Sequence, residues 1–230
     1  MEIKDHQVHV WQANVNVSSG YPQDISKVLS PDEISRANKF KFPGDLEHFM
    51  LRRYQLRLIL SKYWGCQPHE LMFGYNLFKK PFINLPEPEG VKFNMSFSGN
   101  LVLVGLSKNH EIGIDIEKVR PMQDLENIAR ENFSIPEVKS LNRRKDKINT
   151  FFRIWTRKEA FIKAKGYGMY YPLKSFCVNM NPSGRSEHLI IFNHPKESGL
   201  WRTTEIKTSD GYIASMAIKS DAFQISYFIL

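Results

Sequence analysis

The sequence is poor in cysteine and has no long apolar run. Its 230 residues include two cysteines, Cys66 and Cys177. Two cysteines provide no disulfide framework, and a transmembrane helix would need about 20 consecutive apolar residues. Residues 1–5 also lack the basic segment and the apolar stretch of a secretory signal. The sequence therefore predicts a cytoplasmic protein that does not associate with a membrane.

Acidic residues are fewer than basic ones. There are 24 Asp and Glu against 32 Lys and Arg, which gives a net charge of +8. This excess suits an anionic partner, which can be nucleic acid, a phosphorylated small molecule or an acidic protein. A lysine-rich solvated surface explains the same charge without a partner. The hydrophobic content of 42% is that of a globular protein, so motifs must decide between these classes.

Several catalytic signatures are missing. The sequence has no G-x-x-x-x-G-K-[ST], no G-x-G-x-x-G after a strand, no G-x-S-x-G and no paired C-x-x-C. Its histidines are scattered among polar and turn segments, so neither a histidine triad nor a zinc site is expected. The remaining candidates for chemistry are carboxylates and basic side chains.

The expected elements repeat in the two halves of the chain. Each half has a strand, a helix that begins after a serine and a long helix that ends at a glycine. In the first half these three elements are expected at residues 3–17, 30–40 and 47–64, and Pro43-Gly44 ends the first helix. In the second half they are expected at 110–117, from 134 onward and at 151–165. Further strands are expected at 91–107, 189–192, 203–206, 212–218 and 223–229. Ser30 and Ser134 lie 104 positions apart, and Gly65 and Gly166 lie 101 apart. The pattern predicts an α+β fold of two similar lobes, residues 1–108 and 109–230, with a cleft between them.

Two carboxylates share one face of the expected strand at 110–117. Isoleucines alternate along this strand, which places Asp115 and Glu117 together on the other side, roughly 6 to 7 Å apart. Hard oxygen ligands at this spacing can bind one cation such as Mg²⁺. A solvated acidic strand edge would give the same pattern, so the spacing alone leaves both interpretations open.

The helix expected at 151–165 carries a third acid. Glu159 falls on an apolar stripe with Phe151, Trp155 and Ile162, where an unpaired carboxylate would be costly. An ordinary surface pair with Lys163 is the alternative. Basic residues that suit phosphate accompany the three acids: Lys158 and Lys163, Arg52 and Arg53, and Lys79 and Lys80. Together they resemble a phosphoryl-transfer site.

Two motifs carry a resemblance to a known family. Residues 113–117 read Gly-Ile-Asp-Ile-Glu, and residues 155–163 read Trp-Thr-Arg-Lys-Glu-Ala-Phe-Ile-Lys. They resemble the motifs G-[IV]-D-[IV]-E and W-[ST]-x-K-E-[AS]-x-x-K of the Sfp-type 4′-phosphopantetheinyl transferases. The resemblance covers nearly the whole chain, including residues 29–33, 80–81, 93–96 and 171–173. It implies a pseudo-twofold pair of α+β lobes with coenzyme A in the cleft.

The resemblance also implies a reaction. Members of the family transfer the phosphopantetheine arm of coenzyme A to a serine of an acyl or peptidyl carrier protein, and release adenosine 3′,5′-bisphosphate. Asp115, Glu117 and Glu159 match the acids that bind Mg²⁺, or Mn²⁺, and Glu159 also matches the base for the carrier serine. Lys163 matches a catalytic lysine and, with Lys80, contacts coenzyme A phosphates. The resemblance gives Asp115 and Lys158 supporting places at coenzyme A, and it implies a monomer that binds acidic carriers.

The chain departs from the family at residues 94–98. These read Asn-Met-Ser-Phe-Ser, where the family usually has N-[IL]-S-H-S with the serine and histidine at the 3′-phosphate of coenzyme A. Phe97 cannot donate a hydrogen bond to phosphate. We expect either that Ser96 and Arg52 take over this contact or that the affinity for coenzyme A is reduced. Glu33 stands where relatives often have a basic residue, so no adenine-side contact is expected there.

Two alternatives to the transferase are considered. One is a homologue that binds coenzyme A or a carrier without turnover, which Phe97 suggests and the intact set of three acids opposes. The other is a basic nucleic-acid-binding module. It is disfavoured because no aromatic RNA-binding run or helix-turn-helix spacing is visible, and nucleic acid is not expected as a partner. The sequence does not indicate which carrier protein would be modified.

Overall fold

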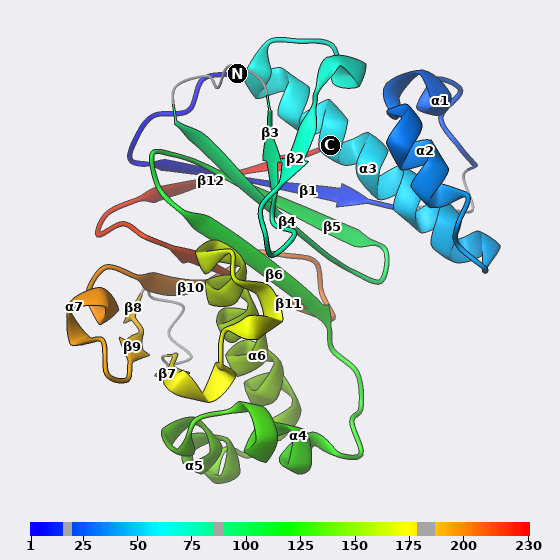
Figure 1. Cartoon of the computed structure of the whole chain (residues 1–230). Coiled ribbons are helices and arrows are strands. Elements are labelled where there is room, and N and C mark those ends of the chain that lie inside the picture. The colour runs from blue at the N-terminus through cyan, green and yellow to red at the C-terminus, as the bar shows by residue number, and fades with distance from the viewer. Residues whose placement is uncertain (16–19, 85–89, 179–186) are drawn as a thin grey trace.

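The chain forms two α+β halves, each built from a four-stranded sheet and a long helix (Figure 1). The computed structural model describes residues 1–15, 20–84, 90–178 and 187–230. The α+β class predicted from the sequence is confirmed. Within this described part of the chain, no helix has the length and apolar character needed to cross a bilayer.

The first sheet has the strand order β12-β1-β5-β4. Its strands are β1 (Gln7–Asn14), β4 (Val91–Ser98), β5 (Leu101–Lys108) and β12 (Gln224–Ile229). The helices of this half are α1 (Ile25–Val28), α2 (Pro31–Ala37) and α3 (Pro43–Trp64), and η2 (Pro68–Glu70) leads to a hairpin of β2 (Phe73–Tyr75) and β3 (Pro81–Ile83). Apolar residues of α3 pack into the same core as β1, β4 and β5.

The first long helix begins earlier than expected. A capping box at Ser30 and Glu33 starts α2, as the sequence indicates. Pro43 was expected to end the preceding helix, and in the structure it is also the first residue of α3, with Phe42 as the N-cap. Proline is favoured at this position since the first helical residue needs no N–H donor. Gly65 ends α3 in the left-handed conformation, with φ of 63°.

The second sheet has the strand order β6-β11-β10-β8. Its strands are β6 (Ile112–Lys118), β8 (Glu187–His188), β10 (Arg202–Ile206) and β11 (Tyr212–Ile218). Its helices are α4 (Leu125–Asn132), α5 (Ile135–Arg143), α6 (Lys147–Lys165) and α7 (Pro195–Ser198), with η3 (Gly168–Tyr170), η4 (Leu173–Ser175) and the short pair β7 (Phe176–Cys177) and β9 (Ile190–Ile191). The helix α6 ends at Gly166 in the left-handed conformation, as α3 ends at Gly65.

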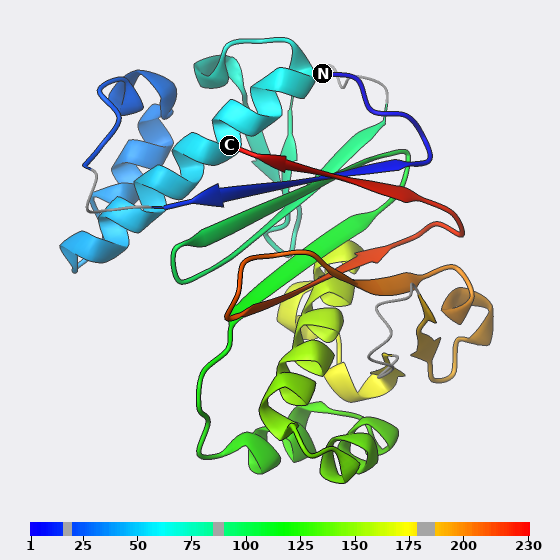
Figure 2. The ribbon, with the colours of Figure 1, turned by 180° about the vertical axis from the view of Figure 1, so that it is seen from behind.

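The last strand returns to the first half. β12 pairs in parallel with β1, and the two strands lie side by side in the view from behind (Figure 2). Residues 224–229 were expected in the second lobe, 109–230, yet they complete the first sheet. Phe228 explains part of this position, because its ring stacks on Trp11 with centroids 4.8 Å apart. The predicted lobe boundary between residues 108 and 109 therefore separates the two sheets, except that the final strand β12 belongs to the first sheet.

The two sheets share an apolar core. The isoleucines of β6 pack with apolar residues of β1, β5 and β11. All three isoleucines, Ile112, Ile114 and Ile116, are at most 1% exposed. The alternation predicted from the sequence is thus confirmed, and the opposite face of β6, with Asp115 and Glu117, is left for α6.

Candidate active site

A close approach between β6 and α6 brings the two sequence motifs together. Gly113 on β6 faces α6, and a Cβ atom there would lie 2.0 Å from the carbonyl oxygen of Ala160 and 2.3 Å from the backbone nitrogen of Ala164. Both distances are below any real contact, so only glycine fits. Ala160 and Ala164 are buried and lie one turn apart on the facing side of α6. The glycine therefore sets how near Glu159 and Lys163 can come to Asp115.

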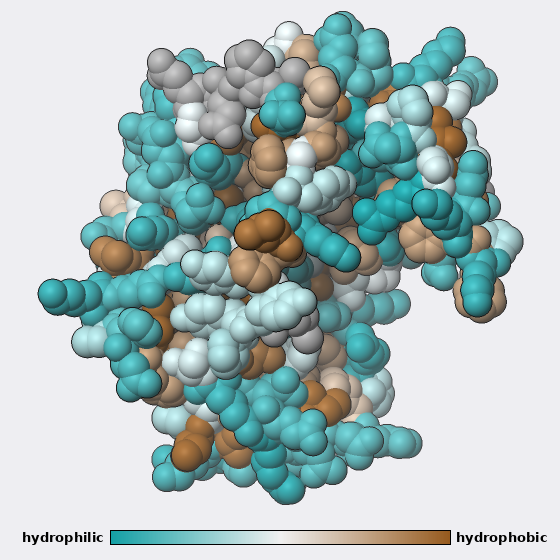
Figure 3. Space-filling model, in the orientation of Figure 1, coloured by the Kyte–Doolittle hydropathy of each residue, from teal (hydrophilic) through white to brown (hydrophobic). Residues whose placement is uncertain are grey.

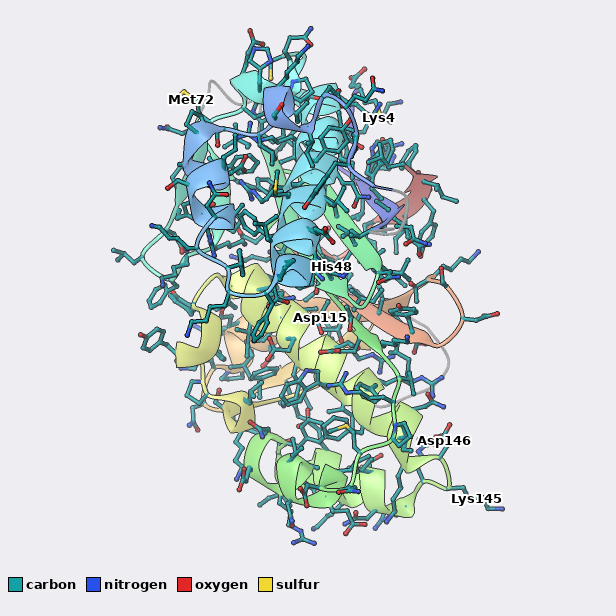
Figure 4. All side chains as sticks on the ribbon, turned by 90° about the vertical axis from the view of Figure 1, so that its right-hand side faces the viewer. Lys4, His48, Met72, Asp115, Lys145 and Asp146 are labelled. Atoms are coloured by element: carbon teal, nitrogen blue, oxygen red, sulfur yellow. The ribbon has the colours of Figure 1, made fainter. Side chains whose placement is uncertain are left out.

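Asp115 is the centre of the site. It is 4% exposed, and its Oδ1 accepts hydrogen bonds from Lys163 Nζ at 2.7 Å and from Ser96 Oγ at 2.9 Å. Lys163 Nζ also donates to Ser96 Oγ at 2.8 Å. Three elements thus meet at one carboxylate: β6, α6 and, from the first half, β4. Figure 4 shows Asp115 in the middle of the molecule, between α3 and α6.

The other oxygen of Asp115 is different. Its Oδ2 is buried and has no hydrogen-bond partner among the described residues. A buried carboxylate oxygen without a partner is costly and commonly marks a bound ion or another ligand. This atom is therefore an acceptor available for a cation or a ligand.

Glu117 lies two residues along the same face of β6. Its Oε2 accepts a hydrogen bond from Ser98 Oγ at 3.0 Å, and Arg120 is 3.7 Å away. Burial raises the pKa of the Glu117 carboxyl, and the charge of Asp115 raises it further, whereas Ser98, Arg120 and Lys163 act in the opposite direction. The charge of Asp115 therefore reaches Glu117 on the same face of β6.

Glu159 completes the acidic group from α6. Burial raises the pKa of the Glu159 carboxyl most, followed by the charge of Asp115, while Lys163 lowers it and Glu117 adds a smaller increase. The structure thus places Asp115 near enough to Glu117 and Glu159 to disfavour the ionised forms of those two carboxyl groups. Perturbed carboxylates that share one cleft are candidates for acid–base chemistry or cation binding.

The acids fit a hard divalent cation by their chemistry. Carboxylate oxygens are the ligands that Mg²⁺ and Mn²⁺ prefer, and Asp115 offers a buried oxygen with no other partner. In the described part of the chain, however, no three acidic, histidine or cysteine side chains are arranged as a metal-ligand cluster. In this structure Asp115 accepts hydrogen bonds from Ser96 and Lys163, and Glu117 accepts one from Ser98.

The structure does not bring Lys158 to the acids. Its side chain is 0% exposed and forms an ion pair with Glu137, with Nζ 2.7 Å from Oε2. Nζ also donates to the carbonyl oxygen of Phe176 at 2.9 Å. Adjacent helical residues point about 100° apart, so Lys158 faces the core of the second half while Glu159 faces β6. The supporting place at coenzyme A that the motif suggested for Lys158 thus has no geometric basis.

Arg52 lies at the edge of the site on α3. Its guanidinium carbon is 3.6 Å from the centroid of the Phe97 ring, and Nη2 is 3.4 Å from the carbonyl oxygen of Gly99. Arg53, the next residue, is buried and pairs with Glu33. Of these two arginines, Arg52 is therefore the one that can meet a ligand. Figure 3 shows that the molecular outline is indented on the side viewed in Figure 4, between the upper and lower halves.

The side chain of Lys80 lies against the last turn of α6, and in the described part of the chain it has no hydrogen bond or ion pair with Asp115, Glu117 or Glu159. Its Nζ donates to the carbonyl oxygen of Ala164 at 2.8 Å and to Glu111 at 3.0 Å. With Glu111, Lys165 and Gly166 it lines a cavity of about 270 Å³ at the junction of the two halves. The Nζ atom of Lys80 thus lies at the C-terminal turn of α6, the part of the helix that carries Lys163.

Three functional contributions were missed by sequence reasoning. The close contact at Gly113 was hidden because glycine carries no chemistry of its own, although Ala160 and Ala164 at helical spacing offered a signal. No role is assigned from the sequence to Glu137, which pairs with Lys158. Likewise, none is assigned to Ser98, whose hydroxyl contacts Glu117.

Comparisons with known proteins agree with the motifs. Residues 111–217 match the family model of the 4′-phosphopantetheinyl transferase superfamily. The chain is 33% identical over 221 residues to the 4′-phosphopantetheinyl transferase HetI of Nostoc, an alignment that covers 95% of this chain and 90% of HetI. It is 31% identical over 159 residues to the transferase Sfp of Bacillus subtilis, covering 68% and 69% of the two chains. On its motifs, its α+β fold and these relatives, the chain belongs to the 4′-phosphopantetheinyl transferase family.

Proposed function

We propose that this chain transfers the 4′-phosphopantetheine arm of coenzyme A to a serine of an acyl or peptidyl carrier protein. Family membership supports the reaction class. The structural observation that carries the proposal is the unpartnered, buried Oδ2 of Asp115 beside two carboxyl groups of raised pKa and one lysine. This combination suits a site that binds a charged phosphate ester rather than a site that only stabilises the fold.

Glu159 is the proton acceptor in this proposal. The serine oxygen of the carrier attacks the phosphorus of the phosphopantetheine group, and a new P–O bond forms. The P–O bond to adenosine 3′,5′-bisphosphate breaks, and the bisphosphate leaves with the electron pair. Glu159, or a water that it orients, takes the serine proton. Its raised pKa suits this role because a base is most effective when its pKa lies near the working pH.

Cations of the protein neutralise the phosphates. Lys163 is held by Asp115 and Ser96 in the centre of the site, where its ammonium group can contact the reacting phosphate. Lys80 and Arg52 extend the positive charge on either side. Asp115, Glu117 and Glu159 would hold Mg²⁺ or Mn²⁺, which when bound supplies charge neutralisation at the pyrophosphate.

Arg52 replaces the missing histidine contact in this proposal. Phe97 supports the guanidinium from one side, and Arg52 Nε is buried without a partner among the described residues. Ser96, by contrast, already bonds Asp115 and Lys163. We therefore assign the phosphate contact mainly to Arg52, while Ser96 positions Asp115 and Lys163 through its hydrogen bonds to them.

In this proposal the working enzyme is a cytoplasmic monomer, and its partner is an acidic carrier protein.

Intact-mass spectrometry tests the proposal. The protein is incubated with coenzyme A, Mg²⁺ and a panel of apo-carrier proteins from fatty-acid, polyketide and peptide synthesis. We expect at least one carrier to gain one phosphopantetheine. Glu159→Gln should abolish the gain, whereas Glu131→Gln, an exposed acid on α4, should leave it unchanged. An unmodified panel, or full activity of Glu159→Gln, would refute the assignment.

A further inference from the structure

Three side chains of β4 reach across to β6. Asn94, Ser96 and Ser98 each accept a hydrogen bond from a backbone N–H of β6, at Ile114, Ile116 and Lys118. The donor advances by two residues each time the acceptor does, so the two strands run in the same direction. Side chains thus take the place of a backbone ladder where the two halves meet.

We infer that Ser98 is a positioning residue that orients the carboxylate of Glu117 for ligand binding. The inference rests on the proposed function, because it gives Glu117 a role at a cation. Ser98 Oγ donates to Glu117 Oε2 at 3.0 Å and accepts from Lys118 N at 3.0 Å. A hydroxyl has one proton, so the bond from Lys118 leaves that proton for the carboxylate.

Other groups near Glu117 hold it less firmly. Arg120 is 3.7 Å away and its side chain is 61% exposed, so water screens this ion pair. The Glu117 side chain itself is only 26% exposed. In the described part of the chain, the hydroxyl of Ser98 is therefore the close donor that fixes one oxygen of the carboxylate and leaves the other free.

The position of Ser98 links the two halves of the molecule. It is the last residue of β4, next to Gly99, whose carbonyl oxygen accepts from Arg52 of α3. A movement of the turn would therefore reach both Arg52 and Glu117. The first half supplies the donor and the second half supplies the carboxylate, so the geometry of the acids depends on how the halves meet.

Asn94 provides a control that distinguishes a role in orienting Glu117 from a role in holding β4 and β6 together. It makes the same kind of bond to β6, from Ile114 N to its Oδ1 at 2.9 Å, and among the described residues it forms no hydrogen bond with any of the three acids. If Ser98 served only to join the strands, replacing either residue would have the same kind of effect. If Ser98 orients Glu117, cation binding should respond to Ser98 alone.

Mn²⁺ binding with coenzyme A present tests the inference, using the electron paramagnetic resonance signal of free Mn²⁺. Ser98→Ala should weaken Mn²⁺ binding about tenfold, since partners behind a metal ligand commonly contribute that much. Ser98→Thr keeps the hydroxyl and should restore affinity. Asn94→Ala should lower the melting temperature with unchanged Mn²⁺ affinity, and Ser98→Thr still provides the comparison if Asn94→Ala does not fold.

Wild-type affinity in Ser98→Ala, or equal weakening in Asn94→Ala, would overturn the inference. A wild-type protein that binds no Mn²⁺ would overturn it as well. These readouts do not require turnover. A protein that binds Mn²⁺ through Ser98 and Glu117 but modifies no carrier would therefore refute the proposed transfer and leave the positioning role standing.

Discussion

The two halves use the same device to anchor a long helix, with different results. In each half the capping-box glutamate of a short helix also pairs with a buried base of the long helix. Glu33 accepts from the backbone of Ser30 and from Arg53 and Arg57 of α3. In the second half, Glu137 accepts from the backbone of Ser134 and from Lys158 of α6.

The two halves differ in the residue that follows the buried base of the long helix. Arg57 is followed by Leu58, an apolar residue, whereas Lys158 is followed by the acid Glu159. One step along a helix turns the side chain by about 100°, so anchoring Lys158 in the core fixes the direction of Glu159. The same ion pair between a short helix and a long one supports the fold in the first half, and in the second half it also fixes the direction of Glu159, an acid of the candidate site.

Removing the anchor of α6 should have the largest effect. Glu137→Gln leaves the Lys158 ammonium buried without its counter-charge, which costs about 3–5 kcal/mol for a buried pair. Urea unfolding measures this loss. The double variant Glu137→Leu with Lys158→Met removes both charges and should recover part of the stability, since the backbone N–H groups of Ser134 and Val178 still lose their acceptor.

The double variant also tests the role of Lys158. If Lys158 contacted coenzyme A, the double variant would lose affinity for it even when stably folded. We expect an unchanged KM for coenzyme A, because Lys158 faces the core. A stable double variant with a much higher KM would show that the sequence motif was the better guide.

The contact at Gly113 gives the next largest effect. Gly113→Ala places a methyl group against the backbone of α6, and we expect a loss of about 3 kcal/mol in the free energy of unfolding, together with loss of transfer. Gly44→Ala in the first long helix is the control, since nothing lies within 4 Å of the added carbon. It should be neutral or slightly stabilising. Equal stability of the two variants in urea would contradict the close contact.

Neighbouring arginines of α3 should separate binding from stability. Arg52→Ala should raise the KM for coenzyme A about tenfold, equivalent to about 1.5 kcal/mol for a lost contact to a charged group, with little change in melting temperature. Coenzyme A lacking its 3′-phosphate should show a smaller change. Arg53→Ala removes one of the two buried arginines that pair with Glu33, and it should instead lower the melting temperature. An unchanged KM in Arg52→Ala would remove this residue from the site.

The smallest effect concerns pH and the first half. Burial lowers the pKa of His9 below the ordinary 6.5, and its ring bonds Tyr63 Oη at 2.8 Å. The unfolded chain therefore binds a proton below pH 6.5 that the folded chain excludes, and stability should fall as pH decreases through this range. His9→Gln should flatten this slope of the unfolding free energy, measured by urea unfolding at several pH values. Identical slopes in the two proteins would refute the role of His9.

Local patterns predicted the elements and much of the site. The capping boxes at Ser30 and Ser134 start helices as expected. The alternation on β6 correctly placed Asp115 and Glu117 on one face, and Lys163 was correctly grouped with them. These features depend on neighbours in the sequence, so their physical causes are visible there.

Features that depend on distant partners were less accessible. Arg53, which the sequence places among the bases that suit phosphate, is buried and points inward with Arg57 to Glu33. A long basic side chain looks the same in the sequence whether it meets solvent or a buried carboxylate. The return of β12 to the first sheet was also missed, since strand pairing requires a partner more than 200 positions away.

The sequence by itself determined the α+β class, the family and the identity of the three acids, because periodicity, capping and motif spacing are local properties of the chain. Only the tertiary structure decided which bases serve the site. Lys158 is taken into the core by Glu137, while Lys163 is held at Asp115 by Ser96 from the other half. The physical reason is that burial and charge pairing decide the role of a lysine, and both are set by residues far from it in the sequence.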